Sequence, residues 1–478
     1  MEKQKYLSVI DERQEQFAAL SDEIWDHPEL NFREFKSAET LCKALAENGF
    51  TVEKELAGIP TAFSGRFGKG HPVIGILGEF DALPGLSQKA GVAVKESLPG
   101  DGCGHGCGHN LLGVGSLAAA AAVKTYLEQT GKPGTVIYFG CPAEEGGSGK
   151  AFMARDGVFD ELDTALSWHP GSLNTVWSFS TLANIQVRYH FTGKSAHAAA
   201  SPHLGRSALD ALELMNIGVQ FLREHIIPEA RVHYAITNTG GAAPNVVQAE
   251  AEALYLIRAP KNSQVQEIYE RVNDIARGAA LMSGVGVEIQ MDKSCSNIVV
   301  NRTLEEILYR NMTEIPLPEY TEEEEKYAKA IQETIEGRTT MADRLEKTMG
   351  PKGRMIGAKY DKQSLYRFVM PYAPGNKPLS GSSDVGDVSW ICPTSQILAS
   401  TGAGGTVEHS WQMVAQGKTS SAHKGMLYAG KVLAGTAIDL FENPELVGKA
   451  KEEHLTQVGE EGYRPLLTPD VKPRIVRD

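Results

Sequence analysis

The apolar residues of this chain first follow a helical period and then collect in short runs. Between residues 11 and 48 they recur at helical spacing, and a His-Pro-Glu break at 27–29 divides the stretch into two predicted helices. Four short apolar runs follow, at 73–77, 135–139, 164–168 and 396–400. Such runs are typical of parallel strands covered on both faces, so the pattern predicts an α/β fold with a mostly parallel sheet.

A different pattern separates the third run from the fourth. Its predicted elements are a strand at 185–191, a helix at 204–222, strands at 232–237 and 246–257, a helix at 264–281 and a strand at 285–291. This β-α-β-β-α-β order is that of a ferredoxin-like domain. We therefore expect a main α/β domain built from 1–184 and 299–478, with an inserted domain at 185–298. Edge strands of such a unit often pair across a two-fold axis, which predicts a dimer.

A second insertion is predicted at residues 313–377. It is highly charged and helical in pattern, with four consecutive glutamates at 322–325. We interpret it as a solvated helical segment with no assigned role, and we expect the glycine-flanked stretch 350–353 to be a loop.

Length, charge and cysteine content exclude several classes of protein. The 478 residues suffice for two domains, and a net charge of −13 argues against nucleic acid and against anionic membrane surfaces as partners. The N-terminal residues carry no apolar signal core, and the apolar run at 111–123 is too short to span a bilayer. Six cysteines are too few for a disulfide scaffold, so we expect a reduced, cytoplasmic protein.

Alternating cysteines and histidines stand directly before the predicted helix at 111–123. Separated only by glycine, such side chains can point at one centre, and divalent metals of borderline softness select this residue pair. The alternative is a glycine-rich loop whose Cys and His have no ligand. Because only Cys107 and His109 adjoin the helix, we assign the site to them and not to Cys103 and His105.

Each strand of the predicted main sheet delivers an acidic or imidazole side chain just past its C-terminal end. These are Glu79 and Asp81, then Glu144 and Glu145, then His169, and finally His409. Ligands of open α/β sheets bind at this edge, so four such coincidences predict one site.

The resulting set has the composition of a catalytic metal centre. Its metal-competent members are Cys107, His109, Glu145, His169 and His409. Two metals bridged by a shared ligand and a water are a known hydrolytic device, and Cys107 can bridge as a thiolate. Glu144 is the candidate general base and Asp81 a candidate partner for a metal-binding imidazole, although an exposed acidic turn is the alternative for the Glu pair.

A phosphate-binding loop is excluded in the same region. The stretch 146–150 has the glycines and lysine of such a loop, but Glu144 stands at its first glycine position. Ala151 follows Lys150 where a Ser or Thr is needed.

The motifs at 104–110, 142–146 and 168–169, with the late His409, resemble the dinuclear metallo-amidohydrolase family of aminoacylases, carboxypeptidase G and auxin-conjugate hydrolases. The resemblance covers nearly the whole chain. It implies two divalent ions per subunit, with Glu144 as base. One ion would be held by Cys107, Glu145 and His409, and the other by Cys107, His109 and His169. The donor set suits zinc, whereas the resemblance points to manganese.

The same resemblance implies roles in the inserted domain. His197 would reach into the partner subunit's site to stabilise the oxyanion, and Asn245 and Arg258 would bind the carboxylate of the substrate. Arg258 has an alternative interpretation as an ordinary strand-end arginine. Carboxypeptidase-like members carry a metal-binding His where this chain has Glu79, which favours His109 as the ligand and leaves Glu79 without a role.

The expected activity is metal-dependent hydrolysis of an amide that joins an acyl or aroyl group to an amino acid. The resemblance favours p-aminobenzoyl-glutamate, a small molecule with a free carboxylate, as the substrate. The expected assembly is a homodimer or a hetero-oligomer with a related subunit. The second hypothesis is a dipeptidase or a general N-acyl-amino-acid amidohydrolase. A non-catalytic or site-completing subunit is the third, and the complete metal and base set argues against it.

Overall fold

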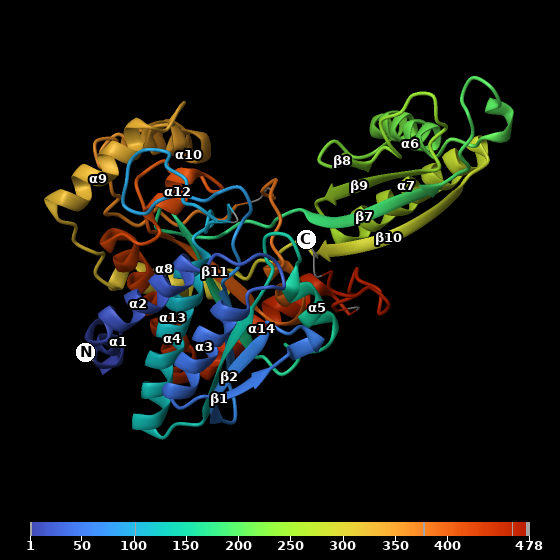
Figure 1. The fold of residues 1–478 in the computed structure, drawn as a ribbon. Coiled ribbons are helices and arrows are strands. Elements are labelled where there is room, and N and C mark those ends of the chain that lie inside the picture. Colours follow the sequence, from blue (N-terminus) through green and yellow to red (C-terminus); the bar gives the residue numbers. More distant parts are fainter. Residues whose placement is uncertain (1, 101, 376–377, 461, 475–478) are drawn as a thin grey trace.

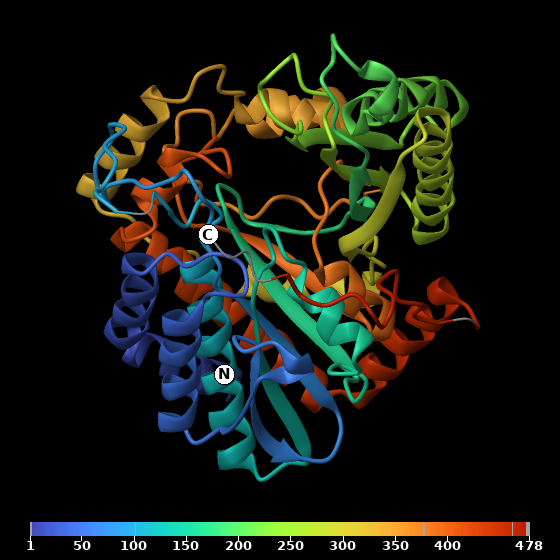
Figure 2. The same cartoon turned by 45° about the vertical axis from the view of Figure 1, so that its right-hand side comes forward.

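The chain contains two β-sheets that belong to different parts of the molecule (Figure 1). The computed structural model describes residues 2–100, 102–375, 378–460 and 462–474. A seven-stranded sheet has the order β1-β2-β4-β3-β5-β11-β6, and a four-stranded sheet has the order β10-β7-β9-β8. The four-stranded unit projects from the larger part, as both views show (Figures 1 and 2).

The larger sheet is parallel at its centre and antiparallel at its edges. Its strands are β1 (Thr51–Lys54), β2 (Phe63–Lys69), β3 (Val73–Glu79), β4 (Gly134–Cys141), β5 (Thr164–Gly171), β6 (Thr175–Val176) and β11 (Thr394–Ser400). Strands β4, β3, β5 and β11 run parallel, and every residue of β3 and β4 is buried. The α/β fold is thereby confirmed. The antiparallel strands β1, β2 and β6 were not predicted, because they carry no continuous apolar run.

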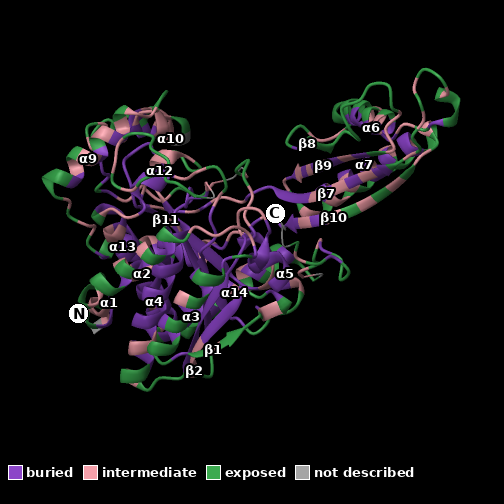
Figure 3. Cartoon of the chain, viewed as in Figure 1, coloured by how far each residue is buried: buried purple, intermediate pink, exposed green. Residues whose placement is uncertain are grey.

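Helices cover both faces of this sheet, and α4 and α13 contribute many residues to its large apolar core. Both helices are mostly buried (Figure 3). The helices of this part are α1 (Glu2–Glu12), α2 (Gln14–Asp26), α3 (Phe35–Glu47), α4 (His109–Thr130), α5 (Gly149–Arg155), α8 (Arg302–Glu314), α11 (Val385–Ile391), α12 (Trp411–Gln416), α13 (Ser420–Glu442) and α14 (Pro444–Val458). Short 3₁₀ helices lie at Leu56–Gly58, Pro202–Leu204 and Arg223–His225.

Helix α4 is longer than the apolar run from which it was predicted. With 22 residues it is long and apolar enough to cross a membrane, so the expectation that this segment is too short was wrong. Its most apolar window is 89% buried inside the protein, between the sheet and α13. A helix that is apolar all round is one that is buried all round, and α4 is the central core helix of the fold.

The four-stranded unit has the predicted order of elements. These are β7 (Ala183–Thr192), α6 (Ala208–Leu222), β8 (Arg231–Asn238), β9 (Glu250–Ala259), α7 (Asn262–Ser283) and β10 (Gly286–Cys295). The sheet is antiparallel and has a separate apolar core shared with α6 and α7. Helix α6 begins at Ala208, later than predicted, because the Ser207 side chain caps it by accepting from the Asp210 N–H. Strand β7 begins two residues before the predicted boundary at 185.

The second insertion contains α9 (Glu322–Glu333) and α10 (Met341–Gly357). The stretch 350–353, expected to be a loop, lies inside α10. The backbone kinks at Gly350, where φ is +64°, and resumes as a helix at Pro351, a residue that fits a first helical turn because it needs no amide hydrogen. Residues 376 and 377, the end of the predicted insertion, lie outside the described residues.

Candidate metal centre

The fold brings the predicted ligands to one edge of the larger sheet. The parallel strands β4, β3, β5 and β11 are consecutive neighbours, so their C-terminal ends meet there. Helix α4 starts at the same edge with His109 as its first residue. Gly108 precedes it at φ +73°, and a Cβ there would lie 2.9 Å from Pro170, so only glycine suits this close approach.

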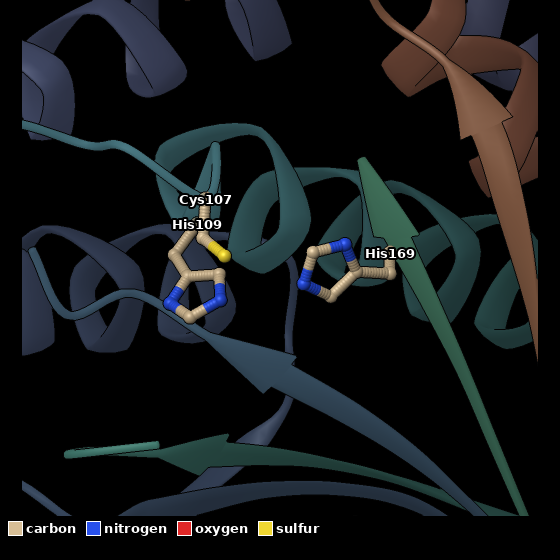
Figure 4. Close-up of side chains that lie close together, drawn as sticks. All are labelled: Cys107, His109 and His169. Carbon is tan, nitrogen blue, oxygen red and sulfur yellow. The ribbon is translucent and has the colours of Figure 1, made fainter. Parts of the chain in front are cut away.

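Three donor groups form a buried cluster (Figure 4). The ligand atoms of Cys107, His109 and His169 lie within 4.8 Å of one another. The His109 side chain is fully buried, and its Nδ1 lies 2.9 Å from Asp81 Oδ1. Its Nε2 is left without a hydrogen-bond partner among the described residues. A buried imidazole that is oriented through one nitrogen and makes no hydrogen bond through the other is suited to bind a metal.

A second cluster shares Cys107 with the first. The ligand atoms of Cys107, Glu145 and His409 also lie within 4.8 Å of one another, and His409 Nε2 is 3.1 Å from Glu145 Oε2. Glu145 Oε1 is buried without a hydrogen-bond partner in the described chain, and the backbone N–H of Glu145 donates to Asp81 Oδ2 at 2.9 Å. Asp81 therefore contacts both clusters, and Cys107 stands between them.

Beneath the clusters lies a buried ion network that the sequence interpretation missed. Lys150 Nζ is 2.7 Å from Glu79 Oε1 and 2.5 Å from Asp384 Oδ1, and none of the three side chains is more than 3% exposed. Glu79 Oε2 lies 3.3 Å from His109 Nε2, and Glu79, His109 and Glu144 form a third group of mutually close ligand atoms. A lysine directly before the apolar stretch 151–153 of α5 was the available signal.

The charges of the site favour bound cations. Burial and the carboxylates of Glu145, Glu408 and Glu144 raise the pKa of the Cys107 thiol well above its usual range. Burial alone would lower the pKa of His109, but its hydrogen bond to Asp81 and the nearby carboxylates raise it well above normal. A concentration of acidic groups beside thiol, imidazole and carboxylate donors fits divalent ions of the softness of zinc or manganese.

Glu144 has the properties of a proton acceptor. Burial, followed by the charges of Glu79 and Glu145, raises the pKa of its carboxyl group well above the usual value. Glu144 and Glu145 can act on different atoms because the backbone before them is irregular, with Ala143 at φ +60°. The Glu34 carboxylate accepts from the Ala143 N–H at 3.0 Å and holds this conformation.

The other cysteine and histidine of the loop lie outside both clusters. His105 Nε2 donates to the backbone oxygen of Ile24 at 3.1 Å, and burial lowers the pKa of His105 to about 4. Neither Cys103 nor His105 belongs to a group of close ligand atoms in the described chain.

The remaining predicted residues lie on the four-stranded unit. His197 pairs with Val246 in an isolated bridge, and Asn245 is beside it because the Ala198 N–H donates to the Asn245 oxygen at 2.9 Å. Arg258 stands near the far end of β9, where its Nη1 donates to Ser382 Oγ at 2.9 Å. None of the three side chains is among the grouped ligands of the same chain.

Comparison with known proteins agrees with this geometry. Residues 75–338 match Peptidase family M20/M25/M40. The chain is 50% identical over 468 residues to a subunit of the p-aminobenzoyl-glutamate hydrolase of Escherichia coli K12, and the match covers 97% of each chain. It is 29% identical to the Xaa-Arg dipeptidase of Mus musculus, over 96% of this chain and 93% of that one.

A solved structure shows the same fold. A dinuclear metal binding peptidase from the M20 family of Bacillus subtilis superposes with a TM-score of 0.57 at 16% identity, covering 90% of this chain and 99% of the other. The chain belongs to peptidase family M20/M25/M40, and it is a metal-dependent amidohydrolase of that family.

Proposed function

We propose that this protein hydrolyses the amide bond of p-aminobenzoyl-glutamate, yielding p-aminobenzoate and glutamate. The observation that carries the proposal is the pair of ligand clusters sharing Cys107, with the Glu144 carboxyl group within 4.8 Å of the His109 ligand atom. The 50% identity to a p-aminobenzoyl-glutamate hydrolase over nearly the whole chain supports this substrate.

The ligand assignment follows the two clusters. Cys107, Glu145 and His409 would hold one divalent ion, and Cys107, His109 and His169 the other, with zinc and manganese both suited to the donors. Bound there, two such ions lower the pKa of water and polarise the scissile carbonyl.

The protein groups move the proton and hold the ligands in place. Glu144 takes a proton from the attacking water and returns it to the nitrogen of the leaving glutamate, a role that its raised pKa supports. Asp81 keeps the proton of His109 on Nδ1, so that Nε2 stays free to bind metal. We place the reaction in the reducing cytoplasm, because six buried cysteines are too few for a disulfide scaffold.

A second copy of the chain, or a related subunit, would complete the site. His197 Nδ1 accepts from the N–H groups of Ala199 and Ala200, so neutral His197 carries its proton on Nε2 and can donate to an oxyanion. Asn245 precedes β9 and Arg258 is near its end, about 30 Å apart for a strand of this length. Both residues can therefore contact one small substrate only if they come from different chains. Arg258 would come from the chain that holds the metal ions, and the partner's Asn245 would lie there together with the partner's His197.

The exposed edge of the four-stranded sheet is the proposed contact. Strand β8 lies at the edge of this sheet. The last six of its eight residues are all exposed, and they include Tyr234 and Ile236. Such an edge is suited to pair with another strand. Light scattering of the purified protein should give a dimer mass, and a monomer at assay concentration would contradict this assembly.

The experiment that tests the function replaces the base. Glu144→Ala should remove nearly all hydrolysis of p-aminobenzoyl-glutamate while the metal content stays unchanged, since Glu144 is not in either ligand cluster that shares Cys107. Retained turnover would refute the base assignment. Faster hydrolysis of dipeptides by the wild type would favour a dipeptidase, and no hydrolysis without a companion chain would favour a site-completing subunit.

A further inference from the structure

The segment that carries His409 contacts the helical insertion, and it is also bonded to Gln416 of α12, which accepts from the Ala403 N–H at 2.7 Å. We define the His409 loop as residues 401–410, between β11 and α12. His409 itself has φ +58°, a left-handed conformation that costs a non-glycine residue free energy unless its surroundings impose it. On one side the His409 N–H donates to the Gly106 oxygen at 2.9 Å, which ties the loop to the Cys107 segment.

On the other side, both backbone groups of Gly404 are bonded to the insertion. The Gly404 N–H donates to the Ser364 oxygen at 2.8 Å, and Gln332 Nε2 of α9 donates to the Gly404 oxygen at 2.9 Å. The ring of Tyr366 lies so close that a Cβ on Gly404 would come within 2.4 Å of it. The loop and the insertion therefore fit each other in one arrangement.

Apolar packing fastens the same two segments. Ala403 of the loop is fully buried in a small cluster with residues of the insertion, namely Ala328, Ile331 and Leu365. At the end of the His169 strand, Leu173 packs against a second apolar cluster of the insertion. Asn174 joins these parts, because its side chain accepts from the Ser400 N–H and donates to the Tyr366 and Phe368 oxygens.

We propose that the insertion at 313–375 is a positioning element for the metal centre, with Gln332 as its principal hydrogen-bond donor to the His409 loop. The inference rests on the proposed function, in which His409 is a metal ligand. Through the backbone of the His409 loop, the insertion acts on the cluster of Cys107, Glu145 and His409. In the other cluster, the His109 imidazole is oriented by Asp81.

The test substitutes Gln332→Met, which keeps the length of the side chain and removes the donor. Glu333→Gln, at the exposed neighbouring position on α9, is the matched control. The metal-stripped proteins are titrated with Zn²⁺ alone, and His409→Ala identifies which binding step belongs to the His409 cluster. Gln332→Met should weaken that step at least tenfold and change the other by less than twofold, with no change in Glu333→Gln.

A second readout needs no metal. In the metal-free protein, amide hydrogen exchange of residues 402–406 should be at least tenfold faster in Gln332→Met than in the wild type, since the bonds at Gly404 are weakened. Unchanged exchange, or equal weakening of both Zn²⁺ steps, would overturn the proposal. A wild type that binds no Zn²⁺ would instead overturn the metal assignment, and the exchange rates would still decide whether the insertion holds the loop.

Discussion

The two halves of the metal centre are built differently. In one half, the side chains of His109 and His169 are 0% and 16% exposed, and His109 is oriented by Asp81 above the Lys150 ion network. In the other half, Glu145 is 7% exposed, but His409 is 55% exposed and stands in a left-handed conformation on a loop. Cys107 belongs to both.

This difference has a physical consequence for metal binding. A ligand fixed by buried partners loses little freedom when it binds, whereas the half-exposed imidazole of His409 loses side-chain freedom. We therefore expect the first ion to bind tightly at the His109 half and the second to bind more weakly at the His409 half. The predictions below test this contrast.

The largest expected effect is on the ion network under the buried half. Lys150→Met leaves Glu79 and Asp384 as buried carboxylates without their counter-charge, which should lower the free energy of unfolding by about 3–5 kcal/mol. Urea unfolding of the metal-free protein measures this change in the free energy of unfolding. Lys89→Met, which removes an exposed pair with Glu96, should cost less than about 1 kcal/mol. Similar losses in the two variants would mean that Lys150 has no special role.

The unfolding free energy should also depend on pH, through a buried carboxyl group on α11. Burial raises the pKa of Asp387 to about 6 despite its hydrogen bonds to Ser296 and Tyr463, against 3.8 for the free side chain. The folded state then binds the proton more tightly, so this group lowers the unfolding free energy by about 3 kcal/mol in total as pH rises from about 3 to 7.

The variant that isolates this group is Asp387→Asn, which should flatten that part of the profile of unfolding free energy against pH. Asp274→Asn on the exposed face of α7 is the control and should leave the slope unchanged. An unaltered slope in Asp387→Asn would show that the carboxyl group is already ionised at pH 4.

A smaller effect is expected where the two halves meet. Asp81→Asn weakens the contacts to both His109 Nδ1 and the Glu145 N–H, so both ions should bind about 10–100-fold more weakly. Calorimetric titration with Zn²⁺ measures the two steps. Asp22→Asn, which alters a similar Asp–His pair with His423, should leave both steps unchanged. A loss confined to one step would show that Asp81 serves one half alone.

The smallest effect concerns backbone strain. His409→Gly relieves the left-handed conformation, so it should change the unfolding free energy of the metal-free protein by less than about 1 kcal/mol. His169 stands in strand β5, so His169→Gly relieves no left-handed conformation and removes packing contacts. It should lower the unfolding free energy by about 1 kcal/mol or more. Equal costs would mean that the His409 loop is not strained.

Much of this architecture was predictable from the sequence, for local reasons. Buried parallel strands need continuous apolar runs, and their C-terminal ends share one edge, so the runs before Asp81, Glu144 and His169 predicted both the sheet and the position of the site. The antiparallel strands β1, β2 and β6 escaped prediction because their short or glycine-containing segments lack such a run.

The sequence by itself determined which side chains are available to bind metal and on which strand ends they stand, because hydrophobic period and donor chemistry are local properties. Only the tertiary structure decided how these side chains are supported. The Lys150–Glu79–Asp384 network joins residues up to 305 positions apart, and the insertion reaches the His409 loop through Gln332. Contacts between distant residues depend on the packed arrangement of whole elements, and no local pattern records them.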